Sequence, residues 1–466
     1  MCMDMQQCAE GFSAESWRAQ ATRNGYDQLL SGRRSTLTRE PVVDETLRQQ
    51  AGNGHVNPRL AWLVAAGLGC FAASVEAKES PFSGGESGGS CGSALEQGLD
   101  LQLVYTGEQA WVRGGKDNGS TYLDNVDLTV AVDLDKLLGQ RGAEVFVYVL
   151  GNQGGSPTKF AGDWQVVSNI DAPDTWKLYE LWYQRRWSED RYSLKAGLYD
   201  LNTEFDAMDT AGLFLNSAFG IGSDISQTGV NGPSIFPTTS LALRGRAELG
   251  AQLYAQAAML DGVPGDPERP HGTRIELDRD DGLLAVGEVG YLHEPAAPQE
   301  GSYRKFALGA WRYTAAVTED AFGSPLRHEE NSGIYVLAEG ALLVEPEDPS
   351  QGLSAFLRYG VADQRINRID AFMSGGMVYS GLLPGREGDR AGIAFAHARN
   401  SERYRQASAA AGAPMDSHET VVELSYRAPV RGWLTLQCDY QYVINPGTDP
   451  QLGDAQVYSL RFEIAL

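Results

Sequence analysis

Side chains that could bind a solute alternate with apolar side chains along several short segments of this sequence. In the segment 178–187, Glu180, Trp182 and Arg186 share one parity, whereas apolar residues such as Tyr179 and Leu181 occupy the other. Successive side chains of a β-strand point to opposite faces, so such a segment presents one polar and one apolar face. The polar face offers hydrogen-bond donors, acceptors and a stacking ring to a passing solute.

The same parity places further charged and polar residues on the polar faces of other segments. We interpret these faces as the lining of a water-filled pore. The candidate substrate-binding residues are Glu180, Trp182, Lys195, Arg244, Arg246, Arg358, Glu423, Arg427 and Asp439. The same faces also carry Tyr199, Gln437, Gln441, Arg461 and Glu463.

Enzyme and metal chemistry find little support in the sequence. The five histidines after residue 77 are dispersed and lack metal-ligand spacing. The acidic run 278–282 lacks the full calcium-loop pattern, and we interpret it as a solvated loop. The segment 88–92 matches G-x-S-x-G, but no strand precedes it to build the turn that this motif needs. We therefore expect no catalytic residue, no cofactor and no bound metal.

About sixteen short alternating segments follow residue 98, and no long amphipathic helix interrupts them. The clearest is 457–466, whose one face holds Tyr458, Leu460 and Phe462 while the other holds Arg461 and Glu463. Either a second sheet or a bilayer could cover such an apolar face. The segments are 99–106, 125–133, 143–151, 178–187, 191–199, 240–248, 250–260, 283–292, 304–314, 333–342, 353–361, 370–380, 391–399, 420–427, 434–442 and 457–466.

This series predicts an all-β fold, a transmembrane antiparallel β-barrel of about 16 strands over residues 99–466. Aromatic residues near segment ends are typical of the girdles at a membrane interface. We assign Trp187, Tyr192, Tyr313, Tyr426 and Trp433 to these girdles. An even strand number puts both termini on the periplasmic side, so 428–432 becomes a periplasmic turn and 445–453 an external loop. Arg386 and Asp389 could form a structural pair at a strand end.

The N-terminal region divides into three parts. Residues 60–75 form an apolar run that follows Arg59 and ends in a small-x-small exit, which is typical of a secretory signal peptide. We predict a signal peptide at 56–77, with translation starting at Val56. Residues 1–55 are then an upstream extension outside the native protein. Residues 78–98 are rich in Ser and Gly and form a flexible segment.

Net charge and cysteine content limit the possible partners. The chain has a formal net charge of −23, which argues against nucleic acid because phosphates would be repelled. Beyond the signal peptide only Cys91 and Cys438 remain, too few for a disulfide framework, although an oxidising compartment could join the two. Cys438 alternates with Leu436 and Tyr440, so we predict a free, buried thiol.

Four segments resemble the carbohydrate-selective porins of the Gram-negative outer membrane, the OprB family. They are 197–205 (GLYDLNTEF), 215–220 (LNSAFG), 381–386 (GLLPGR) with Asp389, and 437–447 (QCDYQYVINPG). The resemblance runs from about residue 95 to 466. It implies a sixteen-stranded outer-membrane channel for passive diffusion of mono- and oligosaccharides, without enzymatic activity. The implied partners are carbohydrate solutes, membrane lipid and lipopolysaccharide and, by analogy with general porins, two further copies in a homotrimer.

The resemblance leaves the roles of single residues open. Trp182 could stack on a sugar ring or fill the barrel wall. Arg244, Arg246 and Arg358 could narrow the channel, or inward cations could pair with carboxylates such as Glu180 to brace a water-filled lumen. A secreted soluble β-sheet protein, either a sugar-binding module or a carbohydrate-active enzyme, is the alternative function.

The predicted processing can be tested on the protein from the cell. We expect mass spectrometry to find a mature N-terminus at Lys78, because cleavage follows the small-x-small exit at residues 75–77. A peptide from residues 1–50 in the cell would show that translation begins upstream of Val56.

Overall fold

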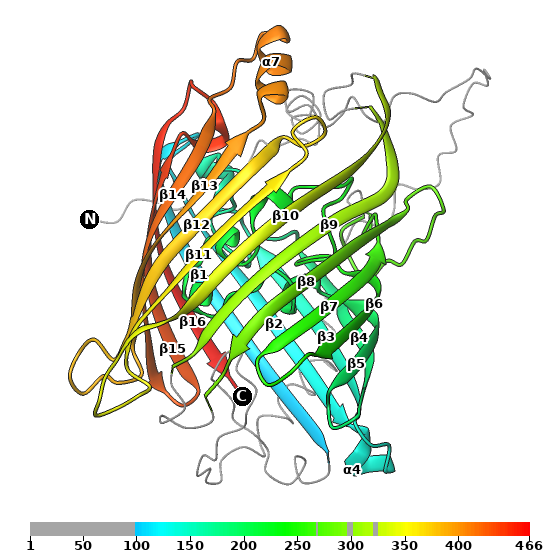
Figure 1. The fold of residues 1–466 in the computed structure, drawn as a ribbon. Coiled ribbons are helices and arrows are strands. Elements are labelled where there is room, and N and C mark those ends of the chain that lie inside the picture. Colours follow the sequence, from blue (N-terminus) through cyan, green and yellow to red (C-terminus); the bar gives the residue numbers. More distant parts are fainter. Residues whose placement is uncertain (1–97, 267–268, 296–301, 320–324) are drawn as a thin grey trace, which may run out of the picture. The chain divides into compact units, whose positions relative to one another are not determined.

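The computed structural model describes residues 98–266, 269–295, 302–319 and 325–466, all within the unit Pro81–Leu466. In this part of the chain, sixteen antiparallel strands form one closed barrel (Figure 1). Each strand pairs with its neighbours in sequence, and β1 closes the ring by pairing with β16, for example Val104 with Ala465. The predictions for 1–55, 56–77 and Cys91, and for 78–98 apart from Gly98, lie outside the described residues.

The strands make up most of the described chain. Their bounds are β1 (Leu99–Gly115), β2 (Gly119–Asp133), β3 (Ala143–Gly154), β4 (Thr175–Trp187), β5 (Tyr192–Tyr199), β6 (Ser240–Glu248), β7 (Leu253–Asp261), β8 (Leu283–His293), β9 (Arg304–Glu319), β10 (Pro325–Val344), β11 (Gly352–Ala362), β12 (Ile369–Ser380), β13 (Arg390–Asn400), β14 (His418–Arg431), β15 (Leu434–Ile444) and β16 (Gly453–Ala465).

The helices are short. They are α4 (Leu134–Leu138), α5 (Thr158–Ala161), η1 (Leu201–Thr203), η2 (Thr210–Leu213), η3 (Ser217–Phe219), α6 (Ser223–Ser226), α7 (Glu402–Ala410) and η5 (Pro446–Thr448). None of the described helices has both the length and the apolar character needed to cross a membrane. In Figure 1, α4 lies at the lower end of the barrel, where β16 ends, and α7 lies at the upper end.

The predicted all-β fold with sixteen strands is confirmed, and every predicted segment overlaps one strand. β1 extends beyond the predicted segment 99–106. The prediction ended there because apolar side chains point inward in the second half of this strand. There Ala110 and Val112 are buried, while Trp111 and Arg113 are exposed. The alternation of apolar outward and polar inward side chains is lost where the inward side chains become apolar.

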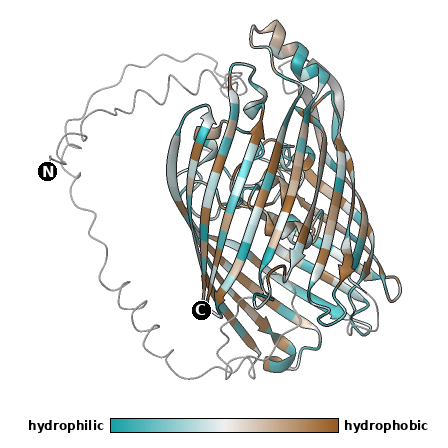
Figure 2. Ribbon diagram, turned by 90° about the vertical axis from the view of Figure 1, so that its left-hand side faces the viewer, coloured by the Kyte–Doolittle hydropathy of each residue, from teal (hydrophilic) through white to brown (hydrophobic). Residues whose placement is uncertain are grey.

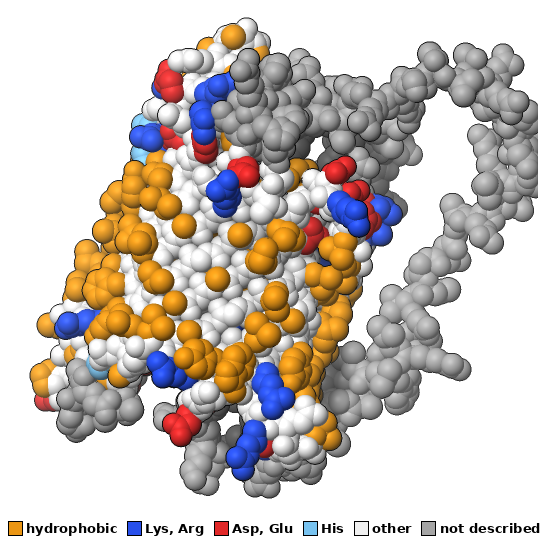
Figure 3. All heavy atoms as spheres, turned by 45° about the vertical axis from the view of Figure 1, so that its right-hand side comes forward, with side chains coloured by type: hydrophobic (Ala, Val, Ile, Leu, Met, Phe, Trp, Pro, Cys, Tyr) orange, Lys and Arg blue, Asp and Glu red, His pale blue; other side chains and the backbone are white. Residues whose placement is uncertain are grey.

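The outer wall is apolar. Leu181, Leu357, Leu424 and Leu460 all lie among the exposed large hydrophobic residues. Figure 2 shows brown hydrophobic positions along the strands, and in Figure 3 hydrophobic side chains are spread over the wall while charged ones gather toward its two ends. A barrel exposes such a band where acyl chains surround it.

Three predictions about single side chains are wrong. Tyr313 does not join an aromatic girdle, because it is 5% exposed and its hydroxyl contacts that of Thr228. Tyr179 leaves the apolar face because a β-bulge in β4 turns it inward. Cys438 is free but exposed, since the apolar face of β15 points outward and not into a protein core.

The protein core lies inside the barrel. The connections 155–174 and 200–239 both leave the same end of the barrel and pack against the inner wall. Phe214 and Phe219 from the second connection contact Phe356 of β11, with ring centroids 5.9 and 6.1 Å apart. In Figure 1, short helices are visible within the ring of strands. We call 155–174 and 200–239 the inserted segments.

The outward position of Leu357 leads to a test of the apolar band. We expect Leu357→Arg to destabilise the barrel in lipid by about 2–4 kcal/mol, the cost of a cation near the bilayer midplane. The measurement is the urea midpoint of folding into vesicles, followed by the shift in gel mobility between boiled and unboiled samples. Leu138→Arg is the control, because Leu138 is 66% exposed but lies in α4, outside the strands. Equal losses in both variants would contradict a lipid-facing wall.

Candidate functional site

Carboxylates on the barrel wall hold the inserted segment 200–239 by its backbone. Their oxygens accept hydrogen bonds from amide groups that would otherwise be unsatisfied inside the barrel. Charge-assisted bonds of this kind are stronger than neutral ones. The pairs are Glu288 with Asp206 N (3.2 Å), Glu339 with Asp209 N (3.1 Å) and Thr210 N (2.7 Å), and Glu423 with Leu215 N (2.5 Å) and Asn216 N (3.1 Å). Strands β8, β10 and β14 thus fix this segment at three points.

The inserted segment 155–174 is held in the same way. Glu419 of β14 accepts hydrogen bonds from the backbone amides of Trp164 and Gln165 at 3.0 to 3.1 Å. It also accepts one from Gly447 N at 2.6 Å. On the opposite end of the chain, Glu108 of β1 accepts from the Ser168 hydroxyl at 3.0 Å. Both inserted segments therefore depend on inward carboxylates.

Amide side chains of β15 complete this support. Gln437 Nε2 donates to the carbonyl oxygen of Leu213 at 2.7 Å, and Gln441 Nε2 donates to that of Val167 at 2.8 Å. Gln441 also donates to Asp439 Oδ1 at 3.3 Å. Asp439 is 6% exposed, so the structure places this predicted pore-lining residue behind the inserted segments.

Arg358 of β11 lies at the centre of a buried ion cluster. Its guanidinium donates to Asp206 through Nε (3.0 Å) and Nη2 (2.8 Å), and through Nη1 to Asp224. Both aspartates belong to the inserted segment 200–239, and Arg358 is only 1% exposed. This side chain therefore ties the segment to the wall and has almost no surface left for a solute.

A second ion cluster joins β5, β6 and the same inserted segment through Glu204. Lys195 Nζ lies 3.0 Å from Glu204 Oε1, and Arg244 donates to both oxygens of Glu204 at 2.6 Å. Arg244 also donates to Gln184 at 2.7 Å. Burial alone would raise the pKa of Glu204, but these two cations outweigh it and lower the pKa to about 2. Glu204 therefore stays ionised at neutral pH.

Two predicted pore-lining residues, Glu180 and Trp182, lie beside this second cluster. Trp182 Nε1 donates to Glu180 at 3.1 Å, and Glu180 is 4% exposed. The indole ring stacks on Phe146 with centroids 5.0 Å apart and lies 4.0 Å from Lys195 Nζ. These two neighbours occupy ring surface that a stacking solute would need.

Three Arg–Glu pairs remain partly exposed on the inner wall. All lie toward the end of the barrel where the short connections are. The pairs are Arg246–Glu248 (2.7 Å), Arg427–Glu463 (2.7 Å) and Arg186–Glu144 (3.1 Å), and the arginine side chains are 25%, 17% and 34% exposed. Among the predicted residues, Arg246 and Arg427 are therefore the charged ones that water reaches.

Two further polar groups from the sequence analysis also form ion pairs. Arg386 and Asp389 form the predicted pair, with Nη2 and Oδ1 2.8 Å apart. Arg461 is buried and pairs with Glu108 at 2.7 Å. In the part of the chain that the structure describes, no group of three His, Cys, Asp or Glu side chains could hold a metal ion.

Of the carboxylates that fix the inserted segments, Glu423 was among the predicted residues, but sequence reasoning missed the others. Glu288 and Glu339 lie on weakly alternating strands, where Gly and Ala blur the apolar face. Asp206 and Asp224 lie in a long connection, where acidic residues normally suggest solvent exposure. The high density of acidic residues within 200–224, together with an inward arginine on a distant strand, was the available signal for these ion pairs.

Comparison with known proteins gives consistent results. The model of the family "Carbohydrate-selective porin, OprB family" matches residues 117–466. The chain is 28% identical to Porin B of Pseudomonas aeruginosa over 440 residues, which cover 86% of this chain and 95% of that protein. It is also similar to the high-pH structure of Pseudomonas putida OprB, with a TM-score of 0.71 and 21% identity, covering 83% of this chain and all of that one. The low-pH structure of the same protein gives a TM-score of 0.52 at 20% identity.

Substitution of Arg358 tests whether this residue holds the inserted segment 200–239 against the barrel wall. We expect Arg358→Ala to loosen the inserted segment, because Asp206 and Asp224 would be left buried without a cation, a change that typically costs about 3–5 kcal/mol. In planar bilayers the variant should show a larger, noisier single-channel conductance and a shift toward cation selectivity.

The control is Arg365→Ala, since Arg365 is 53% exposed and pairs with Asp363 outside the strands. Unchanged conductance and ion selectivity in Arg358→Ala would refute a bracing role for this residue.

Proposed function

The chain belongs to the carbohydrate-selective porins of the OprB family, and we propose that its inserted segments set the width of the sugar path. The protein is a porin of the Gram-negative outer membrane, through which carbohydrates diffuse passively. Family membership implies a channel rather than an enzyme. The alternative of a secreted soluble sugar-binding protein or carbohydrate-active enzyme is not favoured.

The observation that carries this proposal is that inward carboxylates on three strands hold the inserted segment 200–239 by hydrogen bonds. A sixteen-stranded barrel without such a filling leaves a wide aqueous lumen. The buried ion pairs of Arg244 and Arg358 keep the filling in place. These two arginines act through the inserted segment and do not themselves touch the solute.

Direct contact with sugar falls to the partly exposed Arg–Glu pairs. Arg246 and Arg427 offer donors, and Glu248 and Glu463 offer acceptors, which together match the hydroxyl groups of mono- and oligosaccharides. Each pair is already satisfied internally, so a sugar exchanges bonds and gains little net energy. Passage needs such weak, replaceable contacts. The other candidate residues support the channel wall from behind the groups that contact the sugar. They are Glu180, Trp182, Lys195, Glu423 and Asp439.

Lipid and lipopolysaccharide around the barrel, and assembly as a homotrimer, complete the proposal. The exposed apolar wall supports the lipid contact, because exposing so many Leu, Val and Trp side chains to water would be unfavourable. Chemical crosslinking of the protein in native membranes measures the oligomer directly.

The role of the partly exposed pairs can be tested by sugar block of the ion current. We expect Arg246→Gln to raise the concentrations of glucose and maltose that halve the current by about fivefold, since one charged donor is lost. Arg113→Gln is the control, because Arg113 is exposed on the outward face of β1. Vesicles that do not swell in glucose with the unmodified protein would contradict the sugar path itself.

A further inference from the structure

Lys177 departs from the pairing that all other buried cations of the described chain follow. Five Lys and Arg residues are buried there, and four of them pair with carboxylates: Lys195, Arg244, Arg358 and Arg461. Lys177 is 8% exposed, and its one hydrogen bond runs from Nζ to the carbonyl oxygen of Pro237 at 3.0 Å. No Asp or Glu of the described residues pairs with it. A buried charge without a counter-charge is costly unless a ligand supplies one.

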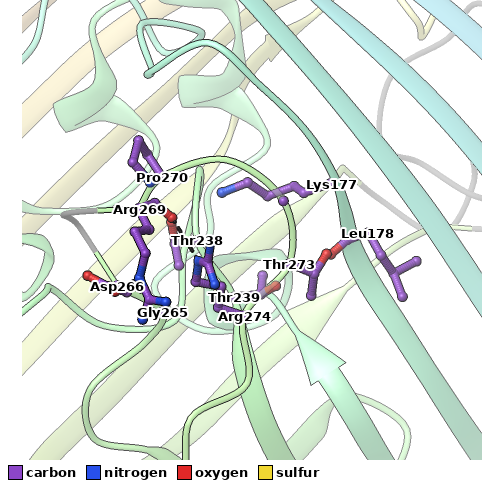
Figure 4. Close-up of a pocket in the computed structure, with 11 residues that line it drawn as sticks. Lys177, Leu178, Thr238, Thr239, Gly265, Asp266, Arg269, Pro270, Thr273 and Arg274 are labelled. Atoms are coloured by element: carbon purple, nitrogen blue, oxygen red, sulfur yellow. Dashed lines mark hydrogen bonds and ion pairs between the residues drawn. The ribbon is translucent and has the colours of Figure 1, made fainter. Parts of the chain in front are cut away.

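A pocket surrounds this ammonium group at the end of the barrel where the inserted segments begin. It lies between the start of β4, the last residues of the inserted segment 200–239 and the connection between β7 and β8 (Figure 4). In Figure 4, the Lys177 side chain points from its strand toward Thr238, Arg269 and Pro270. The ammonium therefore faces the pocket and not the membrane.

A second cation without a carboxylate partner lines the same pocket. Arg274 donates from Nε to the carbonyl oxygen of Arg269 at 3.1 Å and forms no ion pair within the described residues. Arg269 differs, because its guanidinium pairs with Asp266 at 2.6 Å and with Glu276 at 3.0 Å. Asp266, the acidic residue among those lining the pocket, is thus already neutralised.

Backbone contacts keep the walls of the pocket in place. The Thr273 hydroxyl donates to the carbonyl oxygen of Leu178 at 2.7 Å, and Gly272 N donates to the Thr175 hydroxyl at 3.2 Å. Both bonds join the β7–β8 connection to β4. The two cations are therefore presented by a braced site, with the hydroxyl of Thr238 as a neighbouring polar group.

We propose that this pocket binds the acidic group of an anionic sugar, a hexose that carries a carboxylate or a phosphate. Lys177 and Arg274 neutralise the acid, and a carboxylate or phosphate accepts several charge-assisted bonds at once. The sugar ring then lies toward the lumen, beside Thr238. The inference rests on the proposed function, since it adds an entry site for acidic sugars to the path for neutral ones. In a chain of net charge −23, the described residues lining this pocket include Lys177, Arg269 and Arg274 but only one acidic residue, Asp266, and so give such solutes a place to enter.

The test compares current block by glucuronate, glucose 6-phosphate and glucose in planar bilayers, at constant ionic strength, with the full-length folded protein. The acidic sugars should block the unmodified channel at concentrations about tenfold lower than glucose does. Lys177→Met and Arg274→Gln should each raise the half-blocking concentration of glucuronate about tenfold, and leave that of glucose within about twofold. Lys177→Arg, which keeps the charge, should retain most of the block.

The matched control is Arg279→Gln, which removes the same charge from the same β7–β8 connection at an exposed position outside the pocket. Equal losses in Arg279→Gln and Arg274→Gln would overturn the proposal, because the effect would then be general electrostatics. Acetate or inorganic phosphate blocking as well as the acidic sugars would overturn it too, leaving a site for small anions only. Heat-modifiable gel mobility verifies that each variant has folded.

The two proposals fail separately. If glucose neither blocks nor crosses while glucuronate blocks in a Lys177-dependent manner, the neutral-sugar path is wrong and the acidic site stands. If glucose blocks and glucuronate blocks no better, the acidic site is wrong and the sugar path stands.

Discussion

The lumen of this barrel depends on carboxylates that accept hydrogen bonds from the backbone of the inserted segments. The barrel strands satisfy each other's amides, but a chain segment placed inside the ring has no neighbouring strand to pair with. Glu288, Glu339, Glu419 and Glu423 supply the missing acceptors from four inward positions on the wall. Because each ionised carboxylate can accept several bonds, a few side chains hold two long connections.

The inserted segment 200–239 carries buried acidic residues of its own, and the buried arginines balance their charge. Arg358 and Arg244 each sit between the wall and acidic residues of the inserted segment 200–239. Removing a cation would leave charges that neither water nor lipid can solvate. Ion pairs therefore hold the inserted segment 200–239 in the lumen, whereas backbone hydrogen bonds hold the barrel strands together. Lys177 stands outside this balance, and its missing counter-charge is what singles out the pocket near it.

The sequence predicts the wall well and the lumen poorly. Alternation identified all sixteen strands, because each strand separates apolar lipid from a polar interior at every second residue. It failed where the interior itself is apolar, as at Ala110, and where a bulge shifts the parity, as at Tyr179. Pairs such as Arg358 with Asp206 join residues about 150 positions apart through a connection without periodicity. Local pattern carries no information about such contacts.

The position of a polar residue on the inner face therefore does not decide whether a solute reaches it. Arg244 and Arg246 lie two residues apart on one strand and point the same way, yet their side chains are 2% and 25% exposed. The difference comes from Glu204, which the inserted segment brings over Arg244 and not over Arg246. Which inward side chains stay exposed is set by how far the inserted segments extend along each strand. In this barrel the strands define the channel, and under the proposed function the connections define its selectivity.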